Sequence, residues 1–187
     1  MRVTTVAAAL LGLLSVSGVA PSAPPAAPAA SDRPDLVRMF EEDQADRTAT
    51  SIDWAAVQPR DQARLAKVKE LFAAGGLQTG GDLYRAAMIL QHGTVPEDFL
   101  LAHEFCVAAM ALGKADDATR WLAVASEDRF LMNLDRPQRF GTQYRSEGSE
   151  PIRLYKVDEG VTDQLRHIMA APTLAEAKAR EADFAKK

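Results

Sequence analysis

The sequence predicts a mainly α-helical protein, a compact single-domain bundle of about six or seven helices with one small β-hairpin. Three observations lead to this fold class. Apolar residues recur at three- and four-residue spacing through most of the chain, and glycines or capping residues separate these stretches. One late segment differs, because β-branched and aromatic residues surround the turn-like sequence SEGSE.

The first three helices are predicted from apolar spacing and from the residues that begin and end them. The first begins near Asp35, with apolar residues on one side and charges on the other. We expect the second to begin at Pro59 or just after it, because proline is favoured in a first turn, and to end at the glycines 75–76. The third, residues 82–91, has inward positions at Leu83, Ala87 and Leu90.

Two more helices follow, and local capping signals place their ends. Thr94 and Glu97 have the spacing of a capping box, which predicts the start of a fourth helix that ends at Gly113. A fifth helix is expected from about Asp116 towards Leu131.

The segment after the fifth helix predicts a hairpin and then two short helices. RFGTQYR (139–145) and IRLYKV (152–157) are expected to pair as strands. Apolar positions in 161–169 indicate the sixth helix. Thr173, with Glu176 three residues later, has the capping-box spacing that begins the seventh.

The N-terminus has the profile of a secretory signal peptide, residues 1–29. A charged start precedes an acid-free apolar run, residues 6–20, which is too short to span a bilayer well. The sequence Ala-Pro-Ala at 27–29 supplies the small residues of a cleavage site. We therefore expect an exported protein, periplasmic or extracellular, with a Pro/Ala-rich leader at 30–34 and a single helical domain at 35–187.

Composition excludes several classes of function. The chain has 22 Lys and Arg against 26 Asp and Glu, and this mildly acidic balance argues against binding to nucleic acid, or to anionic membrane after signal cleavage. Cys106 is the only cysteine, so an intrachain disulfide is excluded. The histidines lack zinc-ligand spacing and the glycine pairs lack a phosphate-loop lysine, so we predict no metal site and no cofactor.

His92 is the first candidate for chemistry. It follows Gln91 at the end of the third predicted helix, where the helix dipole favours a protonated imidazole. A histidine there has the properties of a general acid or base, although it is equally a C-terminal cap that bonds the last carbonyls. His103 differs, because its helical neighbours are apolar, and we interpret it as a structural residue of the core.

Asp128, Arg129 and the run that follows them form the second set of candidates. Asp128 lies on the buried stripe of the fifth helix, where a charge needs a partner. The later segment supplies polar and aromatic groups that we expect to contact a ligand, and these are Gln138, Phe140, Gly141, Thr142 and Gln143, with Tyr144 as a further wall. The structural alternative is that these groups bond to one another and join the hairpin to the helices.

Three hypotheses for function remain open at this point. The preferred one is an exported domain that binds a small or peptide-like ligand in a polar pocket where the third and fifth helices meet the Gly-Thr-Gln run. The alternative is a hydrolase-type enzyme with His92 as general acid or base, Asp128 orienting it, and Arg129 stabilising negative charge. The third is an interaction scaffold without a pocket.

A combination of short motifs resembles an uncharacterised bacterial family, a domain of unknown function. The motifs are DQADR at 43–47, DQAR at 61–64, AAMILQHG at 86–93, SEDRFL at 126–131 and RPQRFGTQ at 136–143. The resemblance implies no activity. It points to the Gln-His pair, the Asp-Arg pair and the Gln-x-aromatic-Gly-Thr-Gln run, which here are Gln91, His92, Asp128, Arg129, Gln138, Gly141, Thr142 and Gln143.

We predict that the chain is exported and processed near Ala29. Mass spectrometry of the protein from its native host should find a mature chain without residues 1–29, because the apolar run is the part that export machinery recognises. As a control, Leu13→Arg interrupts this run and should keep the uncleaved protein inside the cell. A cytoplasmic protein that retains Met1 would contradict the prediction.

Overall fold

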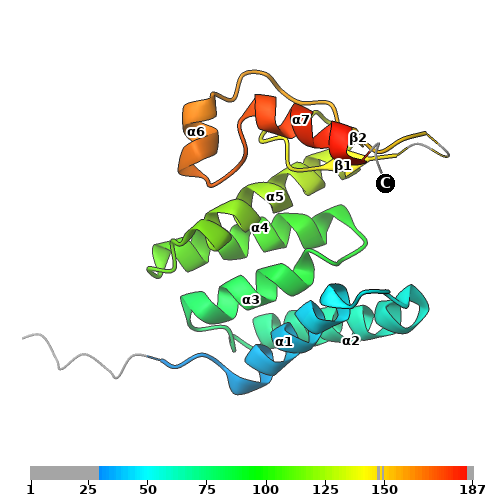
Figure 1. The fold of residues 1–187 in the computed structure, drawn as a ribbon. Coiled ribbons are helices and arrows are strands. Elements are labelled where there is room, and N and C mark those ends of the chain that lie inside the picture. The colour runs from blue at the N-terminus through cyan, green and yellow to red at the C-terminus, as the bar shows by residue number, and fades with distance from the viewer. Residues whose placement is uncertain (1–29, 147, 149, 185–187) are drawn as a thin grey trace, which may run out of the picture.

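The computed structural model describes residues 30–146, 148 and 150–184, so the predicted signal peptide lies outside the described residues. The elements are arranged in layers (Figure 1). Helices α1 and α2 form one end, α3, α4 and α5 form the middle, and a two-stranded hairpin with α6 and α7 covers the other end. The elements are α1 (Pro34–Thr48), α2 (Trp54–Ala73), α3 (Gly80–Leu90), α4 (Pro96–Ala111), α5 (Asp117–Asn133), β1 (Tyr144–Arg145), β2 (Arg153–Leu154), α6 (Asp163–Ile168) and α7 (Leu174–Phe184).

This architecture confirms the predicted fold class, a helical bundle with one small antiparallel hairpin. The main core lies where α3 packs against α1, α2 and α4, and its fully buried residues include Leu36, Val68, Ile89 and Leu90. The inward positions predicted for α3, Leu83, Ala87 and Leu90, are all buried. A smaller core joins α5 to the last third of the chain through Val124, Phe140, Val161 and Ala171.

The predicted start of the second helix was wrong. Helix α2 begins at Trp54, and Pro59 lies inside it. Asp53 caps the helix, because its Oδ1 accepts a hydrogen bond from the backbone N–H of Ala56 at 3.3 Å. Val57 is only 2% exposed, so the extra first turn buries an apolar side chain and offsets the cost of a proline in the second turn.

One of the two predicted capping boxes was also wrong. Helix α4 begins at Pro96 after Val95, and it has no side-chain cap, so Thr94 does not cap it. A proline at the first helical position has no N–H to satisfy and has a helical φ, which explains the start without a box. The box at the start of α7 is confirmed, because Thr173 N donates to Glu176 Oε2 at 2.8 Å and Glu176 N donates to Thr173 Oγ1 at 3.2 Å.

The hairpin is shorter than the sequence predicted. Strands β1 and β2 are antiparallel, with Tyr144 opposite Leu154 and Arg145 opposite Arg153. Residues 139–143, which were expected to belong to the first strand, form a loop instead, and Gln138 before them makes an isolated β-bridge to Val157. The reason is the carboxylate of Asp128 on helix α5, which accepts hydrogen bonds from the backbone of this loop.

Candidate functional site

The carboxylate of Asp128 is fully buried and binds the loop that follows α5. Its Oδ1 accepts hydrogen bonds from the backbone N–H groups of Arg139 at 2.7 Å and Phe140 at 2.9 Å. Its Oδ2 accepts from the N–H of Thr142 at 3.0 Å and from the Thr142 hydroxyl at 2.8 Å. These donors replace the water that the carboxylate loses on burial. We call residues 138–143 the anchor loop.

The side chain of Gln138 closes the two ends of the anchor loop and connects them to the hairpin. Its Nε2 donates to the carbonyl oxygens of Gln143 and Tyr155, both at 2.9 Å, and its Oε1 accepts from the N–H of Gln143 at 2.8 Å. The backbone N–H of Gln138 donates to the carbonyl of Lys156 at 2.9 Å. Gln138 is completely buried, so this amide is a structural element of the loop.

Gly141 meets two requirements that exclude a side chain. Its φ is +77°, in the left-handed region that favours glycine. A Cβ there would lie 3.3 Å from the Cβ of Ala177 and 3.4 Å from Nη1 of Arg166. The groups that approach Gly141 closely therefore belong to helices α6 and α7 of the same chain.

Arg129, next to Asp128 on α5, joins three parts of the fold. Its Nη1 donates to the carbonyl of Gln91 at the end of α3 at 2.7 Å, and its Nε donates to Oε1 of Gln143 at 3.0 Å. The guanidinium carbon lies 5.7 Å from the ring centroid of Phe99, a cation–π distance. Both hydrogen-bond acceptors are neutral, and burial lowers the pKa of Arg129 from its usual value.

Gln91 and His92 end helix α3 with two polar atoms that lack hydrogen-bond partners. Oε1 of Gln91 and Nε2 of His92 are both buried, and no described residue donates to or accepts from them. Nε2 of His92 lies 3.3 Å from Oδ2 of Asp43, an ion-pair distance when the ring is protonated, but the direction is not that of a hydrogen bond. We call Gln91, His92, Arg129 and Gln143 the junction site.

A group of opposite charges on α1 and α2 lies beside His92. Arg47 contacts Asp43 at 2.9 Å and Asp61 at 2.8 Å, and Arg60 and Arg64 both bind Asp46. Hydrogen bonds from these two arginines lower the pKa of Asp46 to about 2. We call the whole group the charge cluster, and its members are Asp43, Asp46, Arg47, Arg60, Asp61 and Arg64.

Five members of the charge cluster lie in the DQADR and DQAR segments and the sixth, Arg60, directly precedes the second, yet we did not select these residues as site residues. The available signal was the spacing of opposite charges at three and four residues on two neighbouring helices, which places them on facing sides. The contact with His92 has no such signal, because Asp43 is distant from it in the sequence.

The structure brings some of the predicted residues together and separates others. Asp128 binds the anchor loop, whereas the carboxylate beside His92 is that of Asp43. Phe140 is 5% exposed and belongs to the smaller core. The hydroxyl of Tyr144 donates to the carbonyl of Ala177 on α7 at 2.8 Å. Nδ1 of His103 lies 2.9 Å from the carbonyl of Ala123, in line with a structural role.

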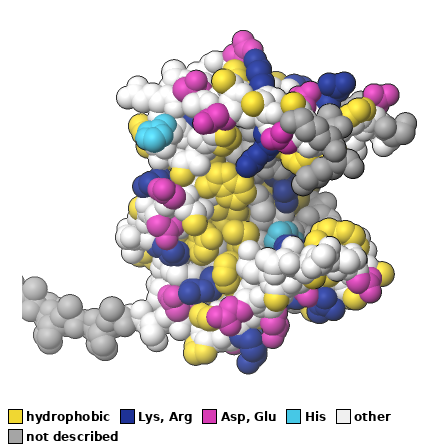
Figure 2. Space-filling model, viewed as in Figure 1, with side chains coloured by type: hydrophobic (Ala, Val, Ile, Leu, Met, Phe, Trp, Pro, Cys, Tyr) yellow, Lys and Arg dark blue, Asp and Glu magenta, His cyan; other side chains and the backbone are white. Residues whose placement is uncertain are grey.

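The surface view gives the setting of these groups. Figure 2 shows hydrophobic side chains gathered on the middle layer, with the molecular outline indented between the α1 and α2 layer and the hairpin layer. Within the described residues, no group of three or more His, Cys, Asp or Glu is placed to hold a metal ion. Among the same residues, no helix is long and apolar enough to cross a membrane.

Comparisons with known proteins add no relative. No protein-family model, curated protein or solved structure matches the chain. The resemblance to a family of unknown function therefore stays a prediction, and the site is argued from its geometry.

We predict that Asp128→Asn lowers the free energy of unfolding by about 3 kcal/mol, because an amide keeps the size of the carboxylate but presents an N–H to buried N–H donors. Chemical denaturation measures the change. Glu127→Gln is the matched control, since Glu127 is adjacent, partly exposed and 3.4 Å from Arg139, and it should cost less than about 1 kcal/mol. Equal unfolding midpoints for Asp128→Asn and the unmodified protein would contradict the role of this carboxylate.

Proposed function

We propose that this chain is a binding protein for a small or peptide-like ligand that carries an anionic group, and that the ligand binds at the junction site. This is the region where α3 and α5 meet the anchor loop. The observation that carries the proposal is the guanidinium of Arg129, a largely desolvated cation whose hydrogen-bond acceptors are all neutral.

Arg129 differs from the three arginines of the charge cluster. Arg47, Arg60 and Arg64 each have an aspartate partner at 2.7 to 2.9 Å. A cation removed from water is costly unless an anion compensates it. Within the described chain no carboxylate pairs with Arg129, and its Nη2 has no hydrogen-bond partner and keeps contact with solvent. An anionic oxygen of a ligand would supply the missing partner.

The neighbours of Arg129 support a ligand with hydrogen-bond donors as well. Gln91 is 5% exposed, and its buried Oε1 accepts no hydrogen bond from the described residues. A buried acceptor without a donor costs free energy, and a ligand N–H or O–H would remove that cost. Because Gln91 and Gln143 already orient the guanidinium, little side-chain entropy is lost on binding. The chemistry fits a carboxylate that also carries an amino or hydroxyl group.

We predict that small carboxylates of this class raise the melting temperature of the protein and that Arg129→Met abolishes this rise. At a ligand concentration of about 100 Kd, a site of this kind adds about 2.7 kcal/mol of stability, or about 5 to 10 °C. His103→Gln, on a histidine outside the junction site, should keep the ligand-induced rise. Each rise is measured against the same variant without ligand, and an undiminished rise in Arg129→Met would overturn the proposal.

A second candidate function is hydrolysis, and the contact between His92 and Asp43 favours it. The Asp43 carboxylate, 3.3 Å from Nε2, is the acidic group beside the ring, the position that the sequence hypothesis gave to Asp128. The other ring nitrogen, Nδ1, would then exchange protons with a substrate. Arg129 would stabilise negative charge that develops on an oxygen.

We predict for this second candidate that His92→Gln lowers turnover of ester or amide model substrates at least about 100-fold, the usual contribution of general acid or base catalysis. Asp43→Asn should lower the turnover less than His92→Gln does, because Asp43 contacts the ring and not the substrate. His103→Gln again serves as the control. Turnover that is the same in His92→Gln and in the unmodified protein would exclude His92 from catalysis.

We also propose that the protein acts outside the cytoplasm. The signal-peptide profile of residues 1–29 supports this location. The acidic balance and the single cysteine, which is buried, are compatible with a ligand-binding domain that needs no disulfide.

A further inference from the structure

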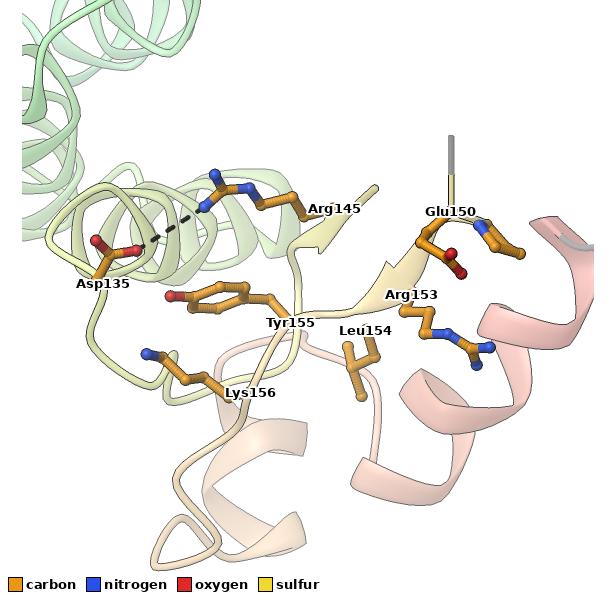
Figure 3. Close-up of a pocket in the computed structure, with 8 residues that line it drawn as sticks. Asp135, Arg145, Glu150, Arg153, Leu154, Tyr155 and Lys156 are labelled. Atoms are coloured by element: carbon orange, nitrogen blue, oxygen red, sulfur yellow. Dashed lines mark ion pairs between the residues drawn. The ribbon is translucent and has the colours of Figure 1, made fainter. Parts of the chain in front are cut away.

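A cavity beside the β-hairpin, separate from the junction site, has a volume of about 470 Å³. Figure 3 shows its side chains, which come from the end of α5 and from both arms of the hairpin. Charged residues of both signs surround an aliphatic centre. We call this cavity the hairpin pocket, and it is lined by Asp135, Arg145, Glu150, Pro151, Arg153, Leu154, Tyr155 and Lys156.

The buried polar contacts of the anchor loop fix the backbone that forms one wall of the hairpin pocket. Gln138 binds the carbonyl of Tyr155 through its side chain and the carbonyl of Lys156 through its own N–H, both at 2.9 Å. The N–H of Tyr155 donates to the carbonyl of Gln143 at 3.1 Å. Because these bonds form without a ligand, the wall is preorganised, which lowers the entropic cost of binding.

Three polar groups of the pocket have no hydrogen-bond or ion-pair partner among the described residues. The ammonium of Lys156 pairs with no carboxylate and lies 5.4 Å from the ring centroid of Tyr155. The hydroxyl of Tyr155 and the carboxylate of Glu150 likewise make no hydrogen bond or ion pair with the described chain. In Figure 3, Tyr155 and Lys156 lie at one end and Glu150 at the other, with Leu154 between them.

The remaining charged residues of the pocket already form ion pairs, and these ion pairs differ in strength. Arg153 contacts Glu181 of α7 at 3.0 Å, so its charge is compensated. Arg145 lies 3.9 Å from Asp135, and both side chains are about half exposed or more, so this contact is weak and easily exchanged for a ligand. We therefore expect the unpaired groups to recognise a ligand. They are the ammonium of Lys156 and the hydroxyl of Tyr155 at one end of the pocket and the carboxylate of Glu150 at the other.

We propose that the hairpin pocket binds a short zwitterionic peptide. The carboxylate of the peptide pairs with Lys156 and accepts a hydrogen bond from the hydroxyl of Tyr155, and its ammonium pairs with Glu150. Leu154 and Pro151 contact an apolar side chain between the two ends. The volume lies in the range of sites for small organic ligands and accommodates a di- or tripeptide. No residue of the junction site lines this pocket, so the two sites have different lining residues.

The test titrates the purified protein with the tripeptide Ala-Leu-Ala and follows binding by calorimetry or by amide chemical shifts. N-acetylated and C-amidated forms of the same peptide lack the ammonium and the carboxylate respectively. We expect the free tripeptide to bind best and each blocked form to bind about two- to fivefold more weakly, the effect of losing one exposed ion pair.

Two variants test which residue of the pocket binds each end of the peptide. Lys156→Met should weaken the free tripeptide and leave the C-amidated form unchanged, and Glu150→Gln should weaken the free tripeptide and leave the N-acetylated form unchanged. Both side chains are exposed, so the variants are expected to fold. Lys178→Met, an exposed lysine on α7 outside the pocket, is the matched control, and Arg129→Met distinguishes this pocket from the junction site. Lys178→Met should leave the affinity unchanged, and Arg129→Met should leave the binding that depends on Lys156 and Glu150 unchanged.

Several results would overturn the proposal. The absence of binding at about 5 mM tripeptide, a concentration that populates even complexes of about −4 kcal/mol, excludes the peptide as a ligand. Equal affinity of the free and blocked forms excludes recognition of the two charges. A loss of affinity in Lys178→Met or Arg129→Met that matches the loss in Lys156→Met places the peptide elsewhere.

Discussion

The buried carboxylate of Asp128 is the constraint on which the C-terminal half of the molecule depends. An ionised group in the interior costs several kcal/mol unless donors surround it, and here the donors are the backbone N–H groups of Arg139, Phe140 and Thr142. A backbone that converges on one carboxylate is not extended, so the anchor loop takes the place of a strand. Its left-handed Gly141 then packs against α6 and α7, and its ends fix the hairpin. Asp128 thus connects α5 with every element that follows it.

The protein uses two different arrangements of buried charge. In the charge cluster, aspartates and arginines of α1 and α2 compensate one another, and Asp43 is fully buried among them. Around the anchor loop, compensation is incomplete. Arg129 binds neutral oxygens, and among the described residues the fully buried Arg166 has only Asp163, at 3.6 Å, as a neighbouring carboxylate. Of these two incompletely compensated guanidiniums, Arg129 belongs to the junction site, where it supports an anionic ligand.

An element of this fold can be predicted from the sequence when the contact that determines it lies between residues close together in the chain. Apolar spacing predicts the helices because each one buries its own stripe, and the box at Thr173 was confirmed because its partner is three residues away. The start of α2 was predicted wrongly, since the cap of Asp53 and the burial of Val57 outweigh the proline signal. The loop at 138–143 was also missed, because Asp128 competes for its N–H groups from a preceding helix. Likewise, nothing near His92 in the sequence indicates that its carboxylate neighbour is Asp43.

The hairpin and its pocket illustrate how a small element acquires a defined shape. A two-stranded hairpin is at best marginally stable in water, and here the paired strands contain only two residues each. Its geometry therefore comes from outside, through Gln138 and the loop that Asp128 fixes, and through Glu181, which accepts a hydrogen bond from the N–H of Leu154 at 3.0 Å. Loss of the loop contacts would release the pocket wall while the α1 to α4 layers keep their own core. A ligand in the hairpin pocket consequently stabilises the same conformation of the loop that Asp128 stabilises, so the two contributions are thermodynamically linked.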